Sequence, residues 1–313
     1  MRRILITGGA GFVGSCLAEK LIQDPENYVV IVDDLSTGEL CKLPLAAHNW
    51  RFIKCNVNHY RDIAAVMLSS SFDYVFHYAA VVGVLRTQMN PVSVLNDIHG
   101  IANVLHLSKN SSVKRVYFSS SSEVYGEPVE LPQNEHTTPL NSRVPYAVVK
   151  NVGEAYLKSF NKEFGLDYTI FRFFNTYGPK QSHDFVMSKF ISLALKNQNI
   201  NIYGDGSQSR TFCYIDDNVD ACYHNFMASE KDPHPVNDII NIGSDIEISI
   251  LDLALKIISM TGSKSKITHK PPLQEGDMQR RLPDIAKMRS LLQRDLLPLE
   301  EGIKKILENQ EYL

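Results

Sequence analysis

The sequence has few of the residues that would build a disulfide framework, a zinc site or a membrane span. Its cysteines are odd in number, widely spaced and form no Cys-x-x-Cys pair: Cys16, Cys41, Cys55, Cys213 and Cys222. This usage favours a protein of the reducing cytoplasm. The ten histidines show no ligand spacing such as His-Glu-x-x-His, so we expect no bound metal. We interpret His77, within a predicted strand, as a packed histidine.

Long apolar runs and an excess of positive charge are also missing. No apolar run approaches the ~18 residues of a membrane-spanning helix. The N-terminal stretch MRRILITGG carries charges but lacks the apolar length of a signal peptide. The net charge is -3, which excludes the basic surface of a nucleic-acid-binding protein. We therefore expect neither a membrane nor a nucleic acid as a partner.

The first part of the chain alternates between apolar strand patterns and amphipathic helix patterns. The composition is 44% hydrophobic over 313 residues, enough for a large core. Helical patterns include 12–23, 92–109 and 146–164. This alternation predicts an α/β fold with a doubly wound parallel sheet of the Rossmann type. The predicted strands cover 3–7, 28–32, 51–54, 73–78, 114–119 and 168–173.

The alternation loosens after about residue 175. A helix at 185–196 and a short strand at 200–203 interrupt it, and a helix at 218–228 and a strand at 239–242 then resume it. We expect residues 1–175, joined by 211–243, to form a cofactor-binding domain. Residues 176–210 and 244–313 would form a smaller α/β C-terminal lobe that binds the substrate.

A glycine-rich turn follows the first strand. The stretch ILITGGAGFVG places Gly8, Gly11 and Gly14 between a strand and a helix, where backbone amides can approach a pyrophosphate. Asp33 ends the next strand, where a carboxylate would bind the adenosine ribose hydroxyls. No arginine follows immediately to accept a 2′-phosphate. The pattern predicts binding of NAD rather than NADP.

A tyrosine and a lysine lie one helical turn apart in PYAVVK. Tyr146 and Lys150 share one helix face, and Ser121 lies at the end of the preceding strand. A phenol has a pKa of about 10, and a nearby ammonium would lower that pKa and make Tyr146 a usable base. We therefore predict that these three residues form a catalytic group.

With these motifs in place, the chain resembles the extended short-chain dehydrogenase/reductases that act on nucleotide sugars. The resemblance rests on TGGAGFVG, DDLSTG, HYAA, SSSSEVYG, PYAVVK, FRFFNTYGP, IYGDGSQSRTFCYIDD and GDMQRRLPDIAK. It implies a nucleotide-sugar substrate, Ser121, Tyr146 and Lys150 as the catalytic set, and a homodimer formed through the helices at 92–109 and 146–164. It further implies that Tyr146 and Lys150 contact NAD together with Gly8, Gly11, Phe12, Val13, Asp33, Leu35, Ser36, Asn56, Val57, Ala79 and Ala80.

The resemblance also implies a substrate site and a shared first step. That step is transfer of hydride from the sugar C4 to NAD, which gives a 4-keto intermediate. Asn175 and Arg210 would contact the diphosphate, and an arginine in the Gly/Ser-rich loop suits bidentate phosphate binding. The remaining substrate contacts would come from Ser122, Tyr203 and Arg281.

The reaction that follows depends on Glu123. Decarboxylases of UDP-glucuronate carry a Thr-Ser-Glu-Val-Tyr-Gly stretch, which the segment 121–126 resembles, and an arginine at the position of Arg281. A guanidinium is a natural partner for a substrate carboxylate. Epimerases usually have an arginine where this chain has Gln274. We therefore prefer a UDP-glucuronate decarboxylase that forms UDP-xylose for polysaccharide biosynthesis, with Glu123 and Arg281 as further catalytic residues.

Two alternatives stay open. The segment NEHTTPLNSRVPYAVVK is nearer the epimerase or dehydratase pattern, so a 4-epimerase of a UDP-hexose, UDP-hexuronate or UDP-N-acetylhexosamine is the first. An NDP-sugar 4,6-dehydratase is the second. Many dehydratases use an Asp-Glu pair, whereas the first position here is Ser122.

Overall fold

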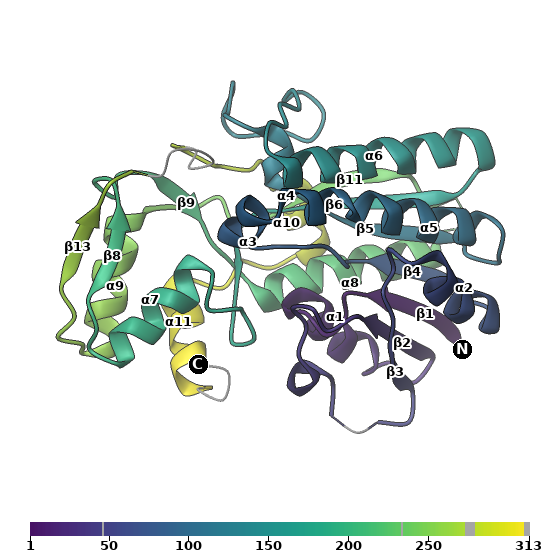
Figure 1. Ribbon diagram of the computed structural model, residues 1–313, viewed down its shortest axis with the longest axis horizontal. Helices are drawn as coiled ribbons and strands as arrows, with labels where there is room; N and C mark the ends of the chain where they lie inside the picture. The colour runs from purple at the N-terminus through teal and green to yellow at the C-terminus, as the bar shows by residue number, and fades with distance from the viewer. Residues whose placement is uncertain (46, 233, 273–278, 310–313) are drawn as a thin grey trace.

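A parallel sheet of seven strands forms the centre of the computed structural model, which describes residues 1–45, 47–232, 234–272 and 279–309. The strand order is β11-β6-β5-β4-β1-β2-β3, and every neighbouring pair runs parallel (Figure 1). This order confirms the predicted α/β fold. The strands are β1 (Arg2–Thr7), β2 (Asn27–Asp33), β3 (Trp50–Lys54), β4 (Tyr74–His77), β5 (Arg115–Ser121), β6 (Asp167–Phe173) and β11 (Asp238–Ile242).

Helices cover both faces of the sheet because alternate residues of each strand point to opposite sides. Ile4 and Ile6 of β1 lie in one core with the helices α1 and α8, and Leu5 lies in a second core with α2, α5 and α6. The sheet is therefore doubly wound, as predicted. These helices are α1 (Phe12–Leu21), α2 (Tyr60–Ser69), α5 (Asp97–Lys109), α6 (Pro145–Phe164) and α8 (Ile215–Lys231).

A smaller α/β lobe lies beside the sheet, at the left of Figure 1. It contains three two-stranded sheets: β8 with β13, β9 with β12, and β7 with β10. Among the helices, α7 packs against α9. The lobe elements are β7 (Thr176–Tyr177), α7 (Val186–Leu195), β8 (Ile200–Tyr203), β9 (Ser209–Thr211), β10 (Cys213–Tyr214), β12 (Glu247–Ser249), α9 (Ile250–Thr261), β13 (Ile267–Lys270) and α11 (Leu299–Glu308).

The predicted helix at 92–109 is wrong as one element. It is two helices, α4 (Pro91–Leu95) and α5, which meet at Asn96. The α-helical pattern is interrupted there because the His99 amide donates to the carbonyl oxygen of Asn96, three residues back rather than four. The remaining short elements are η1 (Leu40–Lys42), α3 (Val84–Met89), η2 (Ser122–Tyr125) and α10 (Ala286–Leu292).

Two boundaries matter for the site. Strand β5 runs two residues further than the predicted 114–119, so Ser120 and Ser121 lie at its carboxyl end within the sheet. Helix α8 begins at Ile215 rather than at 218. No helix in the described part of the chain is both long and apolar enough to span a membrane.

Candidate active site

A cavity of about 900 Å³ lies at the carboxyl ends of the central strands and extends to the lobe. Ligands of open α/β sheets bind at this edge. It is lined by all but one of the predicted site residues: Gly8, Gly11, Phe12, Val13, Asp33, Ser36, Asn56, Val57, Ala79, Ala80, Ser121, Ser122, Glu123, Tyr146, Lys150, Asn175, Tyr203, Arg210 and Arg281. Leu35 is not among the described residues of the lining.

The glycine turn brings backbone close to the cavity. Gly8 has a φ of 69°, and a Cβ there would lie 2.6 Å from the backbone nitrogen of Ala79. A Cβ on Gly14 would lie 2.5 Å from the carbonyl oxygen of Gly8. Helix α1 starts directly after Gly11, and its first residues line the cavity. The N-terminus of a helix attracts anions such as a pyrophosphate, so the residues present here fit NAD.

Asp33 ends β2 at the cavity wall. Its carboxylate accepts hydrogen bonds from the backbone amides of Ala10 at 3.0 Å and Leu35 at 2.9 Å. Burial raises the pKa of Asp33, and these two bonds oppose the rise. Leu35 is not among the described residues that line the cavity, and its contribution is the backbone amide that holds the Asp33 carboxylate.

The ammonium of Lys150 is buried at the end of β5. It donates to the Ser119 carbonyl oxygen at 2.6 Å and to the Ser119 hydroxyl at 3.2 Å. It also lies 5.7 Å from the centre of the Tyr146 ring. Burial lowers the pKa of Lys150 to about 8, and the negative charge of Asp97 opposes that change.

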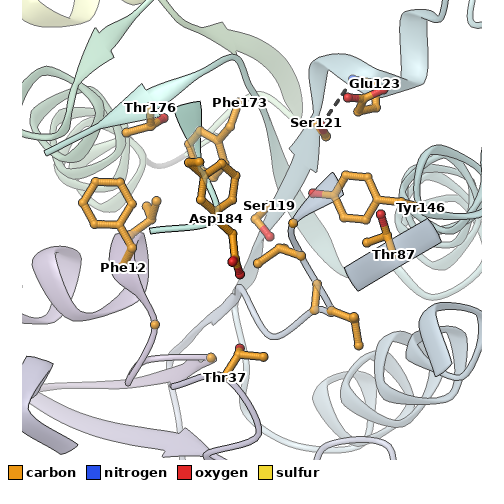
Figure 2. A pocket seen from close by; sticks show the side chains of 18 of the residues that line it. Phe12, Thr37, Thr87, Ser119, Ser121, Glu123, Tyr146, Phe173, Thr176 and Asp184 are labelled. Carbon is orange, nitrogen blue, oxygen red and sulfur yellow. Dashed lines mark hydrogen bonds between the residues drawn. The ribbon is translucent and has the colours of Figure 1, made fainter. Parts of the chain in front are cut away.

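Tyr146 lies beside the strand end that carries Ser119 and Ser121 (Figure 2). Burial raises its pKa above the usual range, and a hydrogen bond with the Ser121 hydroxyl opposes the rise. This direction differs from the expectation that Lys150 lowers the pKa of Tyr146. The reason is that desolvation by burial outweighs the other effects, while the ammonium bonds to Ser119.

Glu123 and Arg281 meet inside the cavity, although 158 residues separate them. Arg281 Nη2 lies 2.7 Å from Glu123 Oε1, and both side chains are largely buried. Glu123 lies in η2, and its backbone amide donates to the hydroxyl of Ser121 at 3.2 Å (Figure 2). Arg280, the neighbour of Arg281, is exposed and pairs with Glu247. The two consecutive arginines therefore point into different environments. Gln274 lies outside the described residues.

The other predicted substrate residues lie toward the lobe. Arg210 is buried in β9, and its Nη1 donates to the Ser209 carbonyl oxygen at 2.8 Å. Asn175 donates through Nδ2 to the carbonyl oxygen of Thr211 at 3.2 Å. Tyr203 ends β8 and is 37% exposed. Tyr203 and Arg210 come from strands of the lobe, whereas the glycine turn follows β1 of the central sheet, so both parts of the molecule line the cavity.

Asp97 lines the cavity but does not stand out in the sequence. Its buried carboxylate accepts from the Val81 amide at 2.7 Å and from Asn58 Nδ2 at 3.1 Å. The predicted helix at 92–109 places Asp97 in a helix interior, and only the structure places it in the first turn of α5. Its approach to Lys150 depends on tertiary structure.

The histidine of β4 is packed, as the sequence suggested. His77 is buried, its Nδ1 lies 2.8 Å from the Thr7 hydroxyl, and burial lowers its pKa to about 3. Within the described residues, no cluster of three His, Cys, Asp or Glu side chains could hold a metal ion.

The interaction between Asp97 and Lys150 leads to a prediction about pH. Asp97→Asn removes the negative charge that raises the pKa of Lys150, so this pKa should fall further below about 8. Carbon-13 NMR of labelled lysine side chains measures this pKa, with Lys150→Met to assign the signal.

The pKa of Lys150 also affects stability. The folded-state pKa lies below the unfolded value of 10.5, so between these two pH values the unfolded state binds more protons. In that window Lys150 should make the free energy of unfolding rise with pH. A Lys150 titration that Asp97→Asn leaves unchanged would show that the carboxylate does not act on the ammonium.

Comparison with known proteins identifies the family. The model of the NAD dependent epimerase/dehydratase family matches residues 4–243 of this chain. A Methanocaldococcus jannaschii protein, provisionally named as a UDP-glucose 4-epimerase, is 36% identical over 97% of both chains. UDP-glucuronic acid decarboxylase 1 of Danio rerio is 35% identical over 98% of this chain and 72% of its own length.

A solved structure has the same fold. The UDP-glucose 4-epimerase of Thermotoga maritima, determined with UDP-glucose, is 32% identical, covers 98% of each chain and superposes with a TM-score of 0.89. Relatives with different reactions are thus about equally similar to this chain. The glycine turn, Asp33, the pair of Tyr146 and Lys150, and these matches together show that the chain belongs to the NAD-dependent epimerase/dehydratase family and is an enzyme that uses NAD.

Proposed function

We propose that this enzyme is a UDP-glucuronate decarboxylase that forms UDP-xylose through a 4-keto intermediate. The observation that carries the proposal is the contact between Arg281 and Glu123 inside the cavity, on the side of Tyr146. A guanidinium there can bind the C6 carboxylate of a hexuronate, and an acid beside it can serve a step after C4 oxidation. A simple 4-epimerase needs neither group.

The first step belongs to the residues at the end of β5 and the start of α6. Tyr146, as phenolate, takes the proton of the sugar 4-hydroxyl, and the Ser121 hydroxyl holds that oxygen in place. The glycine turn and Asp33 would hold NAD, which would supply the hydride acceptor for oxidation of C4 and the hydride donor for its later reduction. Lys150 supplies a positive charge near Tyr146, and the phenolate that burial disfavours then benefits from this charge and from that of the oxidised cofactor.

The second step belongs to Arg281 and Glu123. The substrate carboxylate takes the place of Glu123 on the guanidinium of Arg281, so that two carboxylates face each other across one positive charge. Their repulsion is relieved when the C6 group leaves as CO2 and its electron pair moves toward the 4-keto oxygen. Glu123 takes up a proton from the solvent once CO2 has left and donates that proton to C5 of the enolate.

A 4-epimerase is the second candidate. The similarity to the Methanocaldococcus jannaschii and Thermotoga maritima proteins favours it. In that reaction Tyr146 and Lys150 would act as above, and the ketone would turn before the hydride returned. A 4,6-dehydratase would instead use Glu123 to remove the C5 proton.

We further propose a division of labour within the chain. Residues 1–175 and 211–243 hold NAD, since they supply the glycine turn and Asp33, and β11 joins their sheet. Residues 176–210 and 244–313 hold the nucleotide sugar, with Arg210 at its diphosphate and Tyr203 and Arg281 around the remainder. Two residues of the first part of the chain complete this site: Asn175 at the diphosphate, and Ser122. The five unpaired cysteines suit an enzyme of the cytoplasm.

The proposal predicts the product and two variant phenotypes. Incubation with NAD and a panel of UDP-, GDP- and dTDP-sugars should release CO2 and UDP-pentose from UDP-glucuronate, as detected by mass spectrometry. Glu123→Gln and Arg281→Lys should each lower kcat for this reaction by about 100-fold, since each removes a group that acts on the developing charge.

Arg280→Lys is the matched control for Arg281→Lys and should keep the activity, because Arg280 is exposed and pairs with Glu247. UDP-galacturonate or UDP-galactose as the product would refute decarboxylation in favour of epimerisation. A 4-keto-6-deoxy sugar would refute it in favour of dehydration.

We also propose that the enzyme is a homodimer formed through the helices at 92–109 and 146–164. The apolar side chains of Val92 and Leu95 are 70% and 41% exposed on this face, which supports a partner surface. Light scattering after gel filtration should give twice the 35.3 kDa of one chain. Val92→Glu should weaken the association by inserting a charge, and a monomeric mass for the unmodified protein would contradict the proposal.

A further inference from the structure

Three polar side chains cross the sheet side by side just below the candidate site. Ser120 of β5 and Asn241 of β11 are both direct neighbours of Arg172 on β6 in the strand register. All three are buried. Because residues in register on parallel strands point to the same face, these side chains form one row. Such a row in a sheet interior calls for partners, since a buried polar group without one is costly.

Glu154 of α6 completes the row at one end. Its Oε1 accepts from the Ser120 hydroxyl at 2.6 Å and from Arg172 Nε at 2.9 Å, and its Oε2 accepts from Arg172 Nη2 at 2.7 Å. Both charged side chains are 1% exposed. Helix α6 also carries Tyr146 and Lys150, which lie eight and four residues before Glu154. The helix with the proposed base is therefore fastened to β6 by a bidentate ion pair and to β5 by the hydrogen bond from Ser120.

Tyr125 carries the hydrogen-bonded chain onward. Arg172 Nη1 donates to the Tyr125 hydroxyl at 2.9 Å, and that hydroxyl donates to Asn241 Oδ1 at 2.7 Å. Asn241 Nδ2 in turn donates to the carbonyl oxygens of Gln133 at 2.9 Å and Asp284 at 3.2 Å. Tyr125 ends the η2 turn that holds Glu123, and Asp284 lies three residues after Arg281.

The two ends of this hydrogen-bonded chain lie next to residues of the proposed active site. One end is Ser120, next to Ser121, and the other is the segment that carries Arg281. A buried ion pair is often no better for stability than apolar residues of the same volume. This ion pair lies between four elements that carry proposed catalytic residues: the end of β5, α6, η2 and the segment at 281–284. Hydrogen bonds can fix the relative positions of these elements more specifically than apolar packing would.

We propose that Glu154, Arg172 and Tyr125 are positioning residues that hold the Ser121–Glu123 turn and Arg281 in register with Tyr146 and Lys150. The proposal rests on the proposed function only in taking these five residues as the ones that act. None of the three needs to touch the substrate. They act through Ser120, η2 and the backbone of the segment at 281–284.

Two mild substitutions test the chain at its ends. Tyr125→Phe removes the hydroxyl that joins Arg172 to Asn241, and Ser120→Ala removes one contact of Glu154. Each should lower kcat about tenfold with KM changed less than about twofold, since small misplacements of reacting groups have large effects on rate. The double variant should lose less than the product of the single effects, because both act through the Arg172–Glu154 pair.

The protein offers matched controls. Tyr117, equally buried on β5, and Ser108, buried on α5, lie outside the hydrogen-bonded chain that runs from Ser120 to Asp284. Tyr117→Phe and Ser108→Ala should keep kcat at the wild-type value. Urea denaturation of all four variants separates loss of folded protein from loss of rate.

Product formation gives kcat, and a further readout is the rate of cofactor reduction in a single turnover, followed at 340 nm after NAD-loaded enzyme is mixed with UDP-glucuronate, UDP-glucose or UDP-N-acetylglucosamine. Any C4 oxidation gives this signal, so it remains informative if the product is not a pentose and the decarboxylase proposal fails. Crystal structures of Tyr125→Phe and Ser120→Ala give a second measurement that needs no substrate. The contact between Arg281 and Glu123, 2.7 Å in the wild type, should be lengthened or lost.

Tyr125→Phe and Ser120→Ala with wild-type kcat would overturn the proposal, as would a loss of rate that only follows the folded fraction. If none of the three sugars reduces the cofactor, the crystal structures decide. An unchanged contact between Arg281 and Glu123 in both variants would then overturn it.

Discussion

The buried ammonium of Lys150 is the interaction on which the rest of the site depends. It bonds to the carbonyl oxygen and hydroxyl of Ser119, so it fastens the start of α6 to the carboxyl end of β5. One helical turn earlier, Tyr146 is thereby fixed beside Ser121. Asp97 supplies the opposite charge that lets an ammonium persist where burial lowers its pKa to about 8. This attachment places the proposed base and the end of β5 at the wall of the same cavity.

Local patterns were enough to predict much of the molecule. Strands buried on both faces give apolar runs, so the sequence predicts the parallel sheet. The glycines between the first strand and the first helix predict the turn at Gly8. The position of Asp33 at the end of the next strand predicts its place at the cavity. The helix break at Asn96 could not be predicted, because it depends on where one amide finds its acceptor. The role of Asp97 could not be predicted either. Its carboxylate meets the Val81 amide and acts on Lys150 only when α5 is folded against the loop after β4.

The pKa of Tyr146 shows a different limit. Spacing alone predicts that Lys150 favours the phenolate, but desolvation by burial has the larger effect on the pKa of Tyr146. The positive charge of a bound cofactor is what can reverse this balance.

The contact of Arg281 with Glu123 shows a third limit. It joins residues 158 positions apart. The sequence could place each residue near the site but could not predict that the two side chains bond to each other. Yet it is this pair, rather than the shared hydride machinery, that separates the three candidate reactions.

A hydrogen-bonded chain of polar side chains through the sheet connects these two halves of the site. Glu154 and Arg172 lie next to the proposed hydride-transfer residues, and Asn241 bonds to the segment that follows Arg281.

The central claim is that the sugar C4 is oxidised against Tyr146. The most direct measurement is a crystal structure of the enzyme with NAD and UDP-glucuronate. We predict that the sugar 4-hydroxyl lies within about 3 Å of the Tyr146 hydroxyl, a distance that permits proton transfer, with the nicotinamide next to C4. A sugar bound with its C4 away from Tyr146, or a nicotinamide outside the cavity that holds Lys150, would contradict this claim.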